Sequence, residues 1–316
     1  MKKIVLPGGS GFLGKALAAF FAERGWEVVV LSRHGRACVG GRCVTWDGET
    51  LGDWAGEIDG AAAVINLAGR TVNCRYDAKN RAEICESRLR STRVLGEAIA
   101  LATTPPGVWI NSSSATIYRE ARDRAMDEET GEIGDGFSVD VCAKWERELT
   151  SAVAATTRKV ALRTAIVLGP GAGGAFSPFF NVVRLGLGGR LGDGGQYVSW
   201  IHLDDFCCAA DWIITHEELS GAINCAAPNP VPNADFMREL RQASGRRLGL
   251  PATRWMLEIG AFALRTETEL LLKSRRVVPG KLLASGFEFR FPELGPALAD
   301  LVPRHRAARL PSRASR

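Results

Sequence analysis

Residues 3–31 read KIVLPGGSGFLGKALAAFFAERGWEVVVL, and this stretch decides the fold of the chain. Apolar runs at Lys3–Leu6 and Glu27–Leu31 have the composition of strands, and between them apolar residues recur at helical spacing from Leu13 to Phe21. Gly25 stands where a glycine commonly ends a helix. The order predicts a strand, a helix and a second strand in one parallel βαβ unit.

The turn between the first strand and the helix carries Gly8, Gly11 and Gly14. Glycines here permit a tight turn and let the backbone approach a pyrophosphate, to which the helix N-terminus offers free N–H groups. The alternative is a glycine-rich turn that merely closes a βα unit, but the strand and helix on either side favour a dinucleotide site. The cofactor contacts expected in this turn are Gly8, Ser10, Gly11, Phe12, Leu13 and Gly14.

The second strand ends in Ser32-Arg33, where an NAD-binding protein usually places an acid that holds the ribose hydroxyls. Arg33 instead offers a guanidinium to the 2′-phosphate of NADP, and Ser32 adds a hydroxyl. A solvated loop arginine is the alternative to this reading. We expect NADP(H) as the cofactor. Further contacts are expected along the small residues that close the fourth strand, namely Asn66, Leu67, Ala68 and Gly69.

Strand-like and helical patterns alternate through the first 170 residues and return after residue 198, which predicts an α/β fold. The expected architecture is a Rossmann doubly wound parallel sheet with a smaller α/β C-terminal cap domain. Further strands are predicted at Cys43–Trp46, Ala63–Leu67, Gly107–Ser112, Val160–Val167 and Ala222–Ala226, and further helices at 77–102, 234–244 and 253–273. The expected parts are an NADP-binding domain (1–170 with 198–228), a substrate or cap domain (171–197 with 229–302) and a basic, disordered tail (303–316).

The chain has 316 residues and a formal net charge of +5, but residues 303–316 hold five arginines and no acid. The remainder balances 35 basic against 35 acidic residues, which argues against nucleic-acid binding, although the tail could bind anions. No apolar run is long enough to span a membrane. The eight cysteines lack metal-ligand spacing. We therefore expect reduced thiols, no metal site, and a cytoplasmic monomer or homodimer.

The chain resembles the extended short-chain dehydrogenase/reductases, the nucleotide-sugar epimerase and dehydratase group. The matching segments, in order and at family spacing, are PGGSGFLG (7–14), VINLAG (64–69), NSSSATIY (111–118), LRTAIVLGPG (162–171) and WIHLDDF (200–206). More narrowly, residues 69–92, 186–205 and 277–292 resemble atypical "epimerase family" NAD(P)-binding oxidoreductases. Those proteins carry a distinctive C-terminal domain, and some are labelled cell-division inhibitor.

In that superfamily a serine after the fifth strand acts with a YxxxK pair on the next helix, where the tyrosine is the general acid or base. The resemblance implies Ser114 as the serine and Lys144 as the lysine, which also binds the nicotinamide ribose. Asp140 stands where the tyrosine is expected. Asp140 and Lys144 are either a surviving acid/base pair or a surface ion pair on one helical face. Tyr118 is a candidate substitute proton donor and a candidate substrate contact.

The polar stretch after the fourth strand offers directed hydrogen-bond donors. We expect Arg75, Asn80 and Arg81 to bind an anionic group of the substrate, since guanidinium groups suit phosphate and carboxylate. Salt bridges to nearby glutamates are the alternative. His202 is a candidate base, and its alternative role is structural, packed beneath a helix cap formed by Asp204 or Asp205.

These patterns predict an NADP(H)-dependent oxidoreductase or epimerase-like enzyme that acts on a small polar substrate, with phosphorylated and nucleotide-linked compounds among the candidates. The second hypothesis is a non-catalytic NADP(H)-binding regulatory protein, because the YxxxK tyrosine is missing. The polar stretch after the fourth strand favours the enzyme.

Overall fold

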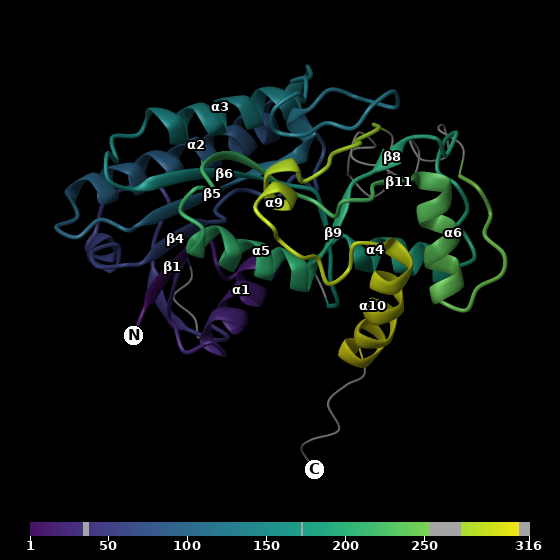
Figure 1. Cartoon of the computed structure of the whole chain (residues 1–316), viewed down its shortest axis with the longest axis horizontal. Coiled ribbons are helices and arrows are strands. Elements are labelled where there is room, and N and C mark those ends of the chain that lie inside the picture. Colours follow the sequence, from purple (N-terminus) through teal and green to yellow (C-terminus); the bar gives the residue numbers. More distant parts are fainter. Residues whose placement is uncertain (34–37, 172, 253–272, 310–316) are drawn as a thin grey trace, which may run out of the picture.

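A computed structural model of the chain describes residues 1–33, 38–171, 173–252 and 273–309. Its centre is a seven-stranded sheet in the order β10-β6-β5-β4-β1-β2-β3, with every neighbouring pair parallel (Figure 1). The strands are β1 (Lys3–Pro7), β2 (Glu27–Ser32), β3 (Arg42–Thr45), β4 (Ala63–Asn66), β5 (Val108–Ser114), β6 (Arg158–Thr164) and β10 (Gly221–Cys225). The strand order reverses beside β1, which confirms the predicted doubly wound Rossmann sheet.

Helices cover both faces of this sheet (Figure 1). They are α1 (Phe12–Ala22) and α5 (Leu203–Thr215) on one face, and α2 (Ala78–Leu101) and α3 (Phe137–Ser151) on the other. Strand β1 shows the sequence basis, because Ile4 and Leu6 enter the core beneath α1 and α5 while Val5 enters the core beneath α2 and α3. A strand that is buried on both faces reads as a continuous apolar run. None of the helices in the described ranges combines the length and apolar composition needed to cross a membrane.

A second apolar core lies beyond β6 and β10. Its buried members include Phe176, Trp200, Phe236 and Leu298. The elements around it are α4 (Phe176–Arg184), β7 (Ile166–Leu168), β8 (Tyr197–Val198), β9 (Trp200–His202), β11 (Val231–Pro232), α6 (Asn233–Ala243) and α10 (Leu294–Arg309). The short helix α9 (Gly280–Ala284) packs against β10 instead. The predicted helix 253–273 lies almost wholly outside the described residues.

The single strand predicted at Val160–Val167 is wrong in one respect, because the chain leaves the main sheet at Thr164. Ala165 N donates to Cys225 O at 3.0 Å, and Ile166 N then donates to Ser199 O at 3.2 Å. The following residues form β7, which pairs with β9 in a separate two-stranded sheet. The sequence gives no sign that the chain changes from the main sheet to β9 here. Both β6 and β7 are largely buried, so the residues of the two strands form one mainly apolar run.

The prediction of a disordered tail from residue 303 is wrong for residues 303–309, which continue helix α10. His305 is fully buried, with its ring 5.3 Å from the ring of Phe176 and 5.0 Å from that of Phe180. Arg306 donates to Ser244 O at 3.0 Å. Partners distant in sequence therefore hold a segment whose composition alone suggested solvation. Residues 310–316 lie outside the described residues.

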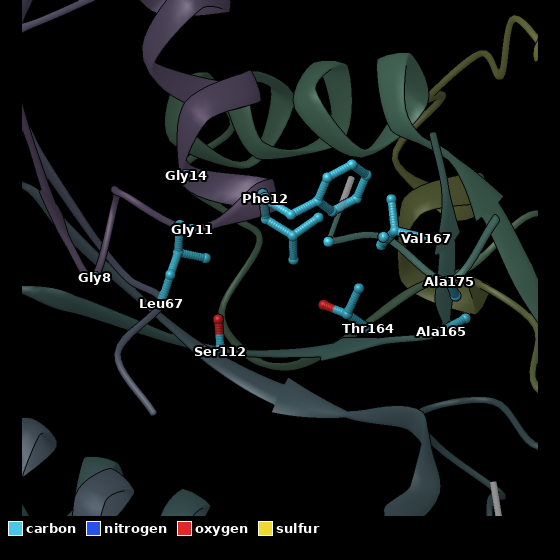
Figure 2. A pocket seen from close by; sticks show the side chains of 13 residues that line it. Gly8, Gly11, Phe12, Gly14, Leu67, Ser112, Thr164, Ala165, Val167 and Ala175 are labelled. Carbon is cyan, nitrogen blue, oxygen red and sulfur yellow. The ribbon is translucent and has the colours of Figure 1, made fainter. Parts of the chain in front are cut away.

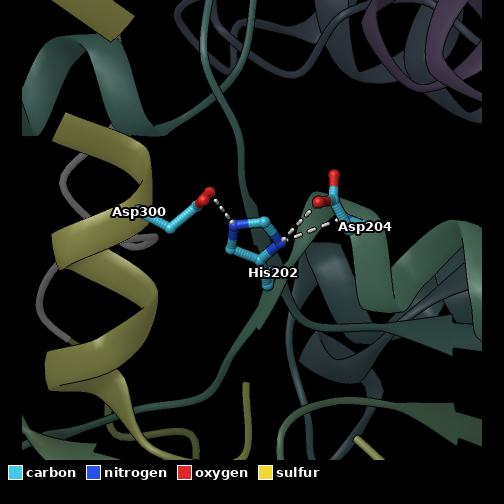
Figure 3. A group of neighbouring side chains, drawn as sticks. All are labelled: His202, Asp204 and Asp300. Carbon is cyan, nitrogen blue, oxygen red and sulfur yellow. Dashed lines mark hydrogen bonds and ion pairs between the residues drawn. The ribbon is translucent and has the colours of Figure 1, made fainter. Parts of the chain in front are cut away.

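His202 joins α5 to α10 (Figure 3). Its Nδ1 accepts a hydrogen bond from Asp204 N at 3.1 Å, so His202 itself caps α5 and the expected aspartate cap is wrong. Its Nε2 lies 3.2 Å from Asp300 Oδ2, and because Nδ1 accepts, Nε2 carries the proton. Arg304 donates to both Asp204 and Asp300. The two aspartates and the histidine are close enough to hold a metal ion, but their polar atoms are already used to dock α10.

A buried arginine in β6 connects the sheet to the C-terminal third of the chain. Arg163, only 9% exposed, donates through Nε and Nη2 to Glu146 in α3 at 2.9 and 2.8 Å. Its Nη1 donates to the Tyr118 hydroxyl at 2.8 Å, which in turn donates to Asn224 Oδ1 at 2.9 Å. Asn224 Nδ2 then donates to Val278 O at 2.9 Å. A buried charge is tolerated here because each step of the network is hydrogen-bonded.

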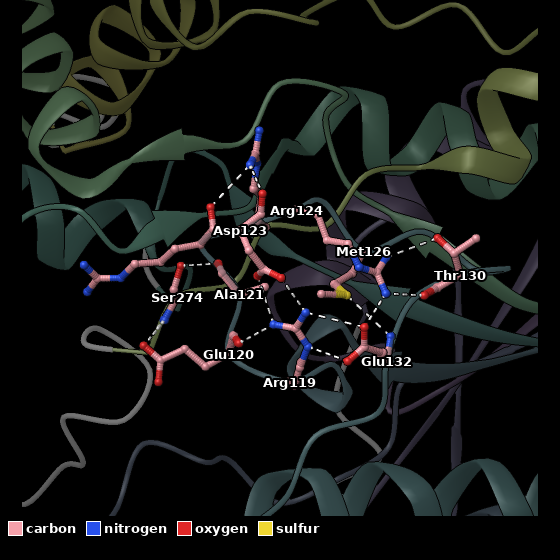
Figure 4. Close-up of polar contacts among 11 residues, drawn as sticks. Arg119, Glu120, Ala121, Asp123, Arg124, Met126, Thr130, Glu132 and Ser274 are labelled. Atoms are coloured by element: carbon pink, nitrogen blue, oxygen red, sulfur yellow. Dashed lines mark hydrogen bonds and ion pairs between the residues drawn. The ribbon is translucent and has the colours of Figure 1, made fainter.

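Residues 274–278 bind the loop that follows the short 3-10 helix η2 (Ala115–Ile117), as Figure 4 shows. Ser274 and Ala121 exchange two hydrogen bonds, at 2.6 and 3.3 Å, and Met126 N donates to the backbone oxygen of Arg276 at 2.7 Å. The loop is also closed on itself by an ion-pair cluster of Arg119, Asp123, Arg124 and Glu132. Backbone and side-chain hydrogen bonds thus join residues 274–278 to the part of the chain that forms the main sheet.

The expectation that every cysteine is a reduced thiol is wrong for one pair, because Cys38 and Cys43 form a disulfide. A turn between the two residues brings their Cα atoms to 5.5 Å, which is within the range that a disulfide requires. The spacing of five residues gave no signal of this pairing, since it depends on the turn before β3. The remaining six cysteines are free.

Replacing Tyr118 by phenylalanine is expected to destabilise the protein. Tyr118→Phe keeps the ring but leaves Arg163 Nη1 and Asn224 Oδ1 unsatisfied, which should lower the free energy of unfolding by about 1–3 kcal/mol in urea denaturation. The matched control is Tyr197→Phe, because the Tyr197 hydroxyl makes no hydrogen bond to a described residue and its loss should change stability little. Equal free energies of unfolding for the two variants would contradict a stabilising role for the Tyr118 hydrogen bonds.

Burial lowers the pKa of His202 from its ordinary value of 6.5, and the neighbouring aspartates offset only part of this effect. The unfolded chain therefore takes up the proton at a higher pH than the folded chain. We expect the free energy of unfolding to fall as the pH drops from about 7.5 to 5.5, and to fall less in His202→Asn, which keeps a capping side chain. Urea denaturation at several pH values measures both slopes, and identical slopes would refute the assignment.

Candidate functional site

The turns after β1 and β4 meet at the point where the strand order reverses. Gly8 has φ 74°, and a Cβ on it would lie 2.7 Å from Ala68 N, so only glycine permits this approach. A Cβ on Gly14 would lie 2.3 Å from Gly9 Cα, which places the start of α1 directly on the first turn. At Gly11, by contrast, a Cβ would meet only Gly8 O, at 3.6 Å, and a side chain there would enter the cleft that Gly11 lines.

Two cavities share this turn. The smaller, of about 370 Å³, lies between the glycine turn, the ends of β5 and β6, and the start of α4. Figure 2 shows Phe12 above this space and the hydroxyl oxygens of Ser112 and Thr164 beside it. Its other walls are small or apolar, among them Leu67, Ala165, Val167 and Gly173–Ala175. The cavity therefore offers two hydroxyl groups in otherwise apolar surroundings.

The larger cavity, of about 810 Å³, lies over the ends of β2 and β3 and the first turns of α2. Ser10, Ser32 and Arg33 line it, and the Ser32 hydroxyl donates to Ser10 Oγ at 3.2 Å. Arg33 is exposed, so its guanidinium is available to a ligand. The structure thus brings the predicted residues of the glycine turn and of the second strand to one cleft.

The sequence prediction missed several residues that line these cavities. Trp46 and Asp47 line the larger one and follow β3, while Ser112 and Thr164 line the smaller one at the ends of β5 and β6. Trp46 and Asp47 lie at or beyond the carboxyl end of the strand predicted at Cys43–Trp46, and Ser112 ends the strand predicted at Gly107–Ser112, so this rule could have found them. Thr164 lies inside the strand predicted at Val160–Val167 and gave no such signal. Arg70, Glu83, Glu86 and Arg90 complete the wall of the larger cavity, where ion pairs join Arg70 to Glu83 and Arg90 to Glu86.

The four residues predicted after β4 have two different roles. Leu67, Ala68 and Gly69 line the larger cavity. Asn66 is fully buried beneath them, where its Nδ2 donates to Asn111 Oδ1 at 2.6 Å and its Oδ1 accepts from Ala68 N at 3.0 Å. The side chain of Asn66 therefore shapes the turn that the cofactor would touch and lines neither cavity.

The predicted catalytic serine and tyrosine lie apart from the smaller cavity. The Ser114 hydroxyl accepts hydrogen bonds from Thr116 N at 3.3 Å and from Thr116 Oγ1 at 3.0 Å, and Ser112, two residues earlier on β5, is the serine that lines the cavity. Tyr118 is 1% exposed and bonded to Arg163 and Asn224. Burial raises the pKa of the Tyr118 hydroxyl. The prediction of Tyr118 as proton donor and substrate contact is therefore wrong, because the buried network holds its hydroxyl.

Asp140 and Lys144 lie one turn apart on α3, and both are exposed. No ion pair joins them in the described part of the chain. Both side chains are thus accessible to a ligand, and the surface ion pair that was the alternative does not form.

The predicted anion-binding residues surround the start of α2. Asn80 is held within the protein, since its Nδ2 donates to Arg75 O at 2.7 Å and its Oδ1 accepts from Arg70 at 2.7 Å. Arg81 donates through Nε to Tyr76 O at 2.8 Å, and its guanidinium lies 5.0 Å from the centre of the Phe137 ring. Arg75 is exposed and also has an interaction partner. The structure brings these residues together at one edge, but the side chain of Asn80, in the first turn of α2, is bonded within the protein.

Comparison with known proteins places this site in a family. Residues 4–226 match the NAD dependent epimerase/dehydratase family, and residues 252–301 match a domain of unknown function, DUF1731. Epimerase family protein SDR39U1 of Homo sapiens is 32% identical over 303 residues, which cover 95% of this chain and 99% of the human protein. A protein from Mycobacterium bovis, epimerase family protein Mb2239, is 34% identical over 95% of this chain and 98% of its own length.

A solved structure extends the match to the fold. The crystal structure of human SDR39U1, isoform 2, with NADPH has a TM-score of 0.84 at 31% identity, over 95% of this chain and 99% of that chain. The resemblance to extended short-chain dehydrogenase/reductases with a distinctive C-terminal domain is thereby confirmed. Both parts of the sequence match, and the fold and the glycine turn agree with them: the chain belongs to the NAD dependent epimerase/dehydratase family.

Proposed function

We propose that the chain is an NADP(H)-dependent oxidoreductase or epimerase-like enzyme that acts on a small polar, anionic substrate. The observation that carries this proposal is the pair of cavities that meet at the glycine turn, one bordered by Ser32 and Arg33 and the other by the hydroxyl groups of Ser112 and Thr164. Residues 171–197 and 229–302 would form the cap over the substrate. The NADPH in the crystal structure of human SDR39U1 agrees with the proposal.

The residues present fit such a cofactor. The close approach of Gly8 to Ala68 leaves the turn without side chains, and Gly11 leaves open the space that both cavities share. Arg33, with Ser32 and Ser10, would hold the 2′-phosphate in the larger cavity. When bound, the nicotinamide ring would donate or accept a hydride. The exposed Lys144 is the candidate for the nicotinamide ribose.

The protein's own chemical groups would orient the substrate and handle a proton. Ser112 offers a hydroxyl donor in a mainly apolar cavity, where a hydrogen bond to a carbonyl or alkoxide oxygen is stronger than in water. The Thr164 hydroxyl, which donates to Leu162 O at 3.2 Å, offers an acceptor beside it. Asp140, exposed on α3, is the candidate proton acceptor or donor in place of the missing tyrosine. Ser114, at the end of β5 but outside the smaller cavity, is the alternative to Ser112 for the hydrogen bond to the carbonyl or alkoxide oxygen.

One observation favours the alternative of a non-catalytic NADP(H)-binding regulator. Tyr118 is withdrawn into the buried network, and no tyrosine of the described residues lines either cavity. A protein of this kind would bind the cofactor and respond to its presence without transferring a hydride.

Cofactor preference is tested by titrating the protein with NADPH and NADH. Wild type should bind NADPH more tightly, and Arg33→Ala should lose about tenfold or more of that affinity with little effect on NADH, because a charge-assisted hydrogen bond contributes about 1.5–3 kcal/mol. The matched control is Arg42→Ala, since the Arg42 guanidinium pairs with Glu57 and lines neither cavity. Equal affinities of wild type for both nucleotides would end the NADP(H) assignment.

A crystal structure of the NADPH complex, together with a screen of small carbonyl compounds for substrate-dependent NADPH oxidation, separates enzyme from regulator. For an enzyme, the C4 edge of the nicotinamide should face open space beside Ser112 and Thr164. Ser112→Ala should then lower kcat by about 10²-fold or more while leaving NADPH affinity unchanged, because its hydrogen bond would form to the reacting oxygen. A C4 edge filled by side chains would exclude hydride transfer and favour the regulator.

A further inference from the structure

Arg88 is a half-buried arginine of α2 whose guanidinium donates hydrogen bonds to the protein through Nη1 only. Its Nη1 donates to Ile84 O at 2.9 Å and to Arg70 O at 3.1 Å. Its Nε and Nη2 make no hydrogen bond to a described residue, and neither is among the buried polar atoms that lack a partner. Each of these two nitrogens therefore keeps some accessible surface. Nε and Nη2 form one edge of the guanidinium, the fork that binds two oxygens of a carboxylate or phosphate.

Two neighbours besides these hydrogen-bond acceptors pack against the Arg88 guanidinium. A Cβ on Gly69 would lie 3.2 Å from Arg88 Cζ, so the guanidinium packs directly against the turn after β4. The ring of Trp145 in α3 lies 5.1 Å from Cζ. The Trp145 ring is itself anchored, because its Nε1 donates to Thr92 Oγ1 at 2.9 Å. The fork is thus preorganised, which reduces the entropy lost when it binds a ligand.

Arg88 has no acidic partner in the described structure, unlike Arg90 and Arg93 on the same helix. Arg90 pairs with Glu86 and Arg93 with Glu148, but no ion pair involves Arg88 within the described ranges. Burial lowers the pKa of Arg88, and the groups that act against this effect are two thiols and a phenol, none of them a carboxylate. A partly desolvated cation without a counter-ion costs stability, and a bound anion would remove that cost.

The Arg88 guanidinium lies at the same end of the sheet as the candidate catalytic serines, because it packs against the turn after β4. Cys142, whose thiol interacts electrostatically with Arg88, lies 3.6 Å from Thr116 Oγ1 and hydrogen-bonds to the backbone of Ser114. Arg88 itself lines neither the larger nor the smaller cavity. The site is therefore separate from the residues that would hold the cofactor phosphates, and it adjoins the part of β5 that ends in Ser114.

We propose that the Nε/Nη2 edge of Arg88 is the anion-binding site for the substrate, and that the substrate carries a carboxylate or phosphate group. The inference rests on the proposed function and names its substrate class. It assigns to Arg88 the role that the sequence had suggested for Arg75 and Arg81. Binding at a preorganised fork would also orient the rest of the substrate relative to the cofactor.

The test measures the Tm of the full-length protein saturated with NADPH, so that the cofactor itself fills the phosphate sites of the cleft. Inorganic phosphate and malonate are titrated separately against sodium chloride at constant ionic strength, since a ligand that binds the folded state raises Tm with its concentration. Wild type should be stabilised by one of the two oxyanions beyond the chloride control. A response to phosphate alone assigns a phosphorylated substrate, and a response to malonate alone assigns a carboxylate.

Arg88→Gln should bind the same oxyanion about tenfold or more weakly, which is the loss expected for a charge-assisted pair. The matched control is Arg93→Gln, on the same helix, whose side chain is exposed and paired with Glu148, and it should respond as wild type does. If Arg88→Gln does not fold, Arg88→Lys takes its place, because a lysine keeps the charge but loses the fork and should respond several-fold more weakly.

No oxyanion response in wild type, or an unchanged response in the Arg88 variant, overturns the anion site while leaving NADP(H) binding intact. A failure of NADPH to raise Tm instead contradicts the proposed function. In that case the comparison of wild type with the Arg88 variant is made without cofactor, and a difference between them still supports the anion site.

Discussion

The structure depends on the close contact between the turn after β1 and the turn after β4. Gly8 approaches Ala68 so closely that any Cβ would clash with the backbone, and Gly14 approaches Gly9 in the same way. These contacts fix where α1 begins and how far the two turns stand apart. Both cavities are bordered by Gly8, Gly11 and Leu67, so the shape of the whole cleft follows from this one constraint.

The C-terminal third of the chain is joined to that cleft by polar contacts far from the glycines. Arg163 reaches Glu146 on one side and, through Tyr118, Asn224 on the other. Once Tyr118 satisfies this buried charge, it is no longer available to a substrate. The same hydroxyl cannot both complete the network and donate a proton in the cleft, and the network explains why a residue in a promising sequence position has a structural role.

The arginines near the cleft show how context separates residues of one type. Arg33 is exposed at the larger cavity, Arg90 is paired with Glu86, and Arg81 lies against Phe137. Arg88 alone among these four combines partial burial with an open hydrogen-bonding edge and no acidic partner in the described structure. If the Arg88 guanidinium served stability alone, a carboxylate beside it would make the folded state more stable. The absence of that carboxylate in the described structure therefore supports a role in binding a ligand.

The sequence by itself determined the Rossmann sheet, the glycine turn and the Ser32-Arg33 site, because each depends on residues close in the chain and on backbone limits that glycine alone meets. It could not determine the burial of Tyr118 in a hydrogen-bond network, the packing of residues 303–309 or the Cys38–Cys43 disulfide. Those features depend on partners brought close only by folding, whether 106 residues away, as for Tyr118 and Asn224, or across a turn. Tertiary structure decided them because burial and hydrogen bonding act on distances in space.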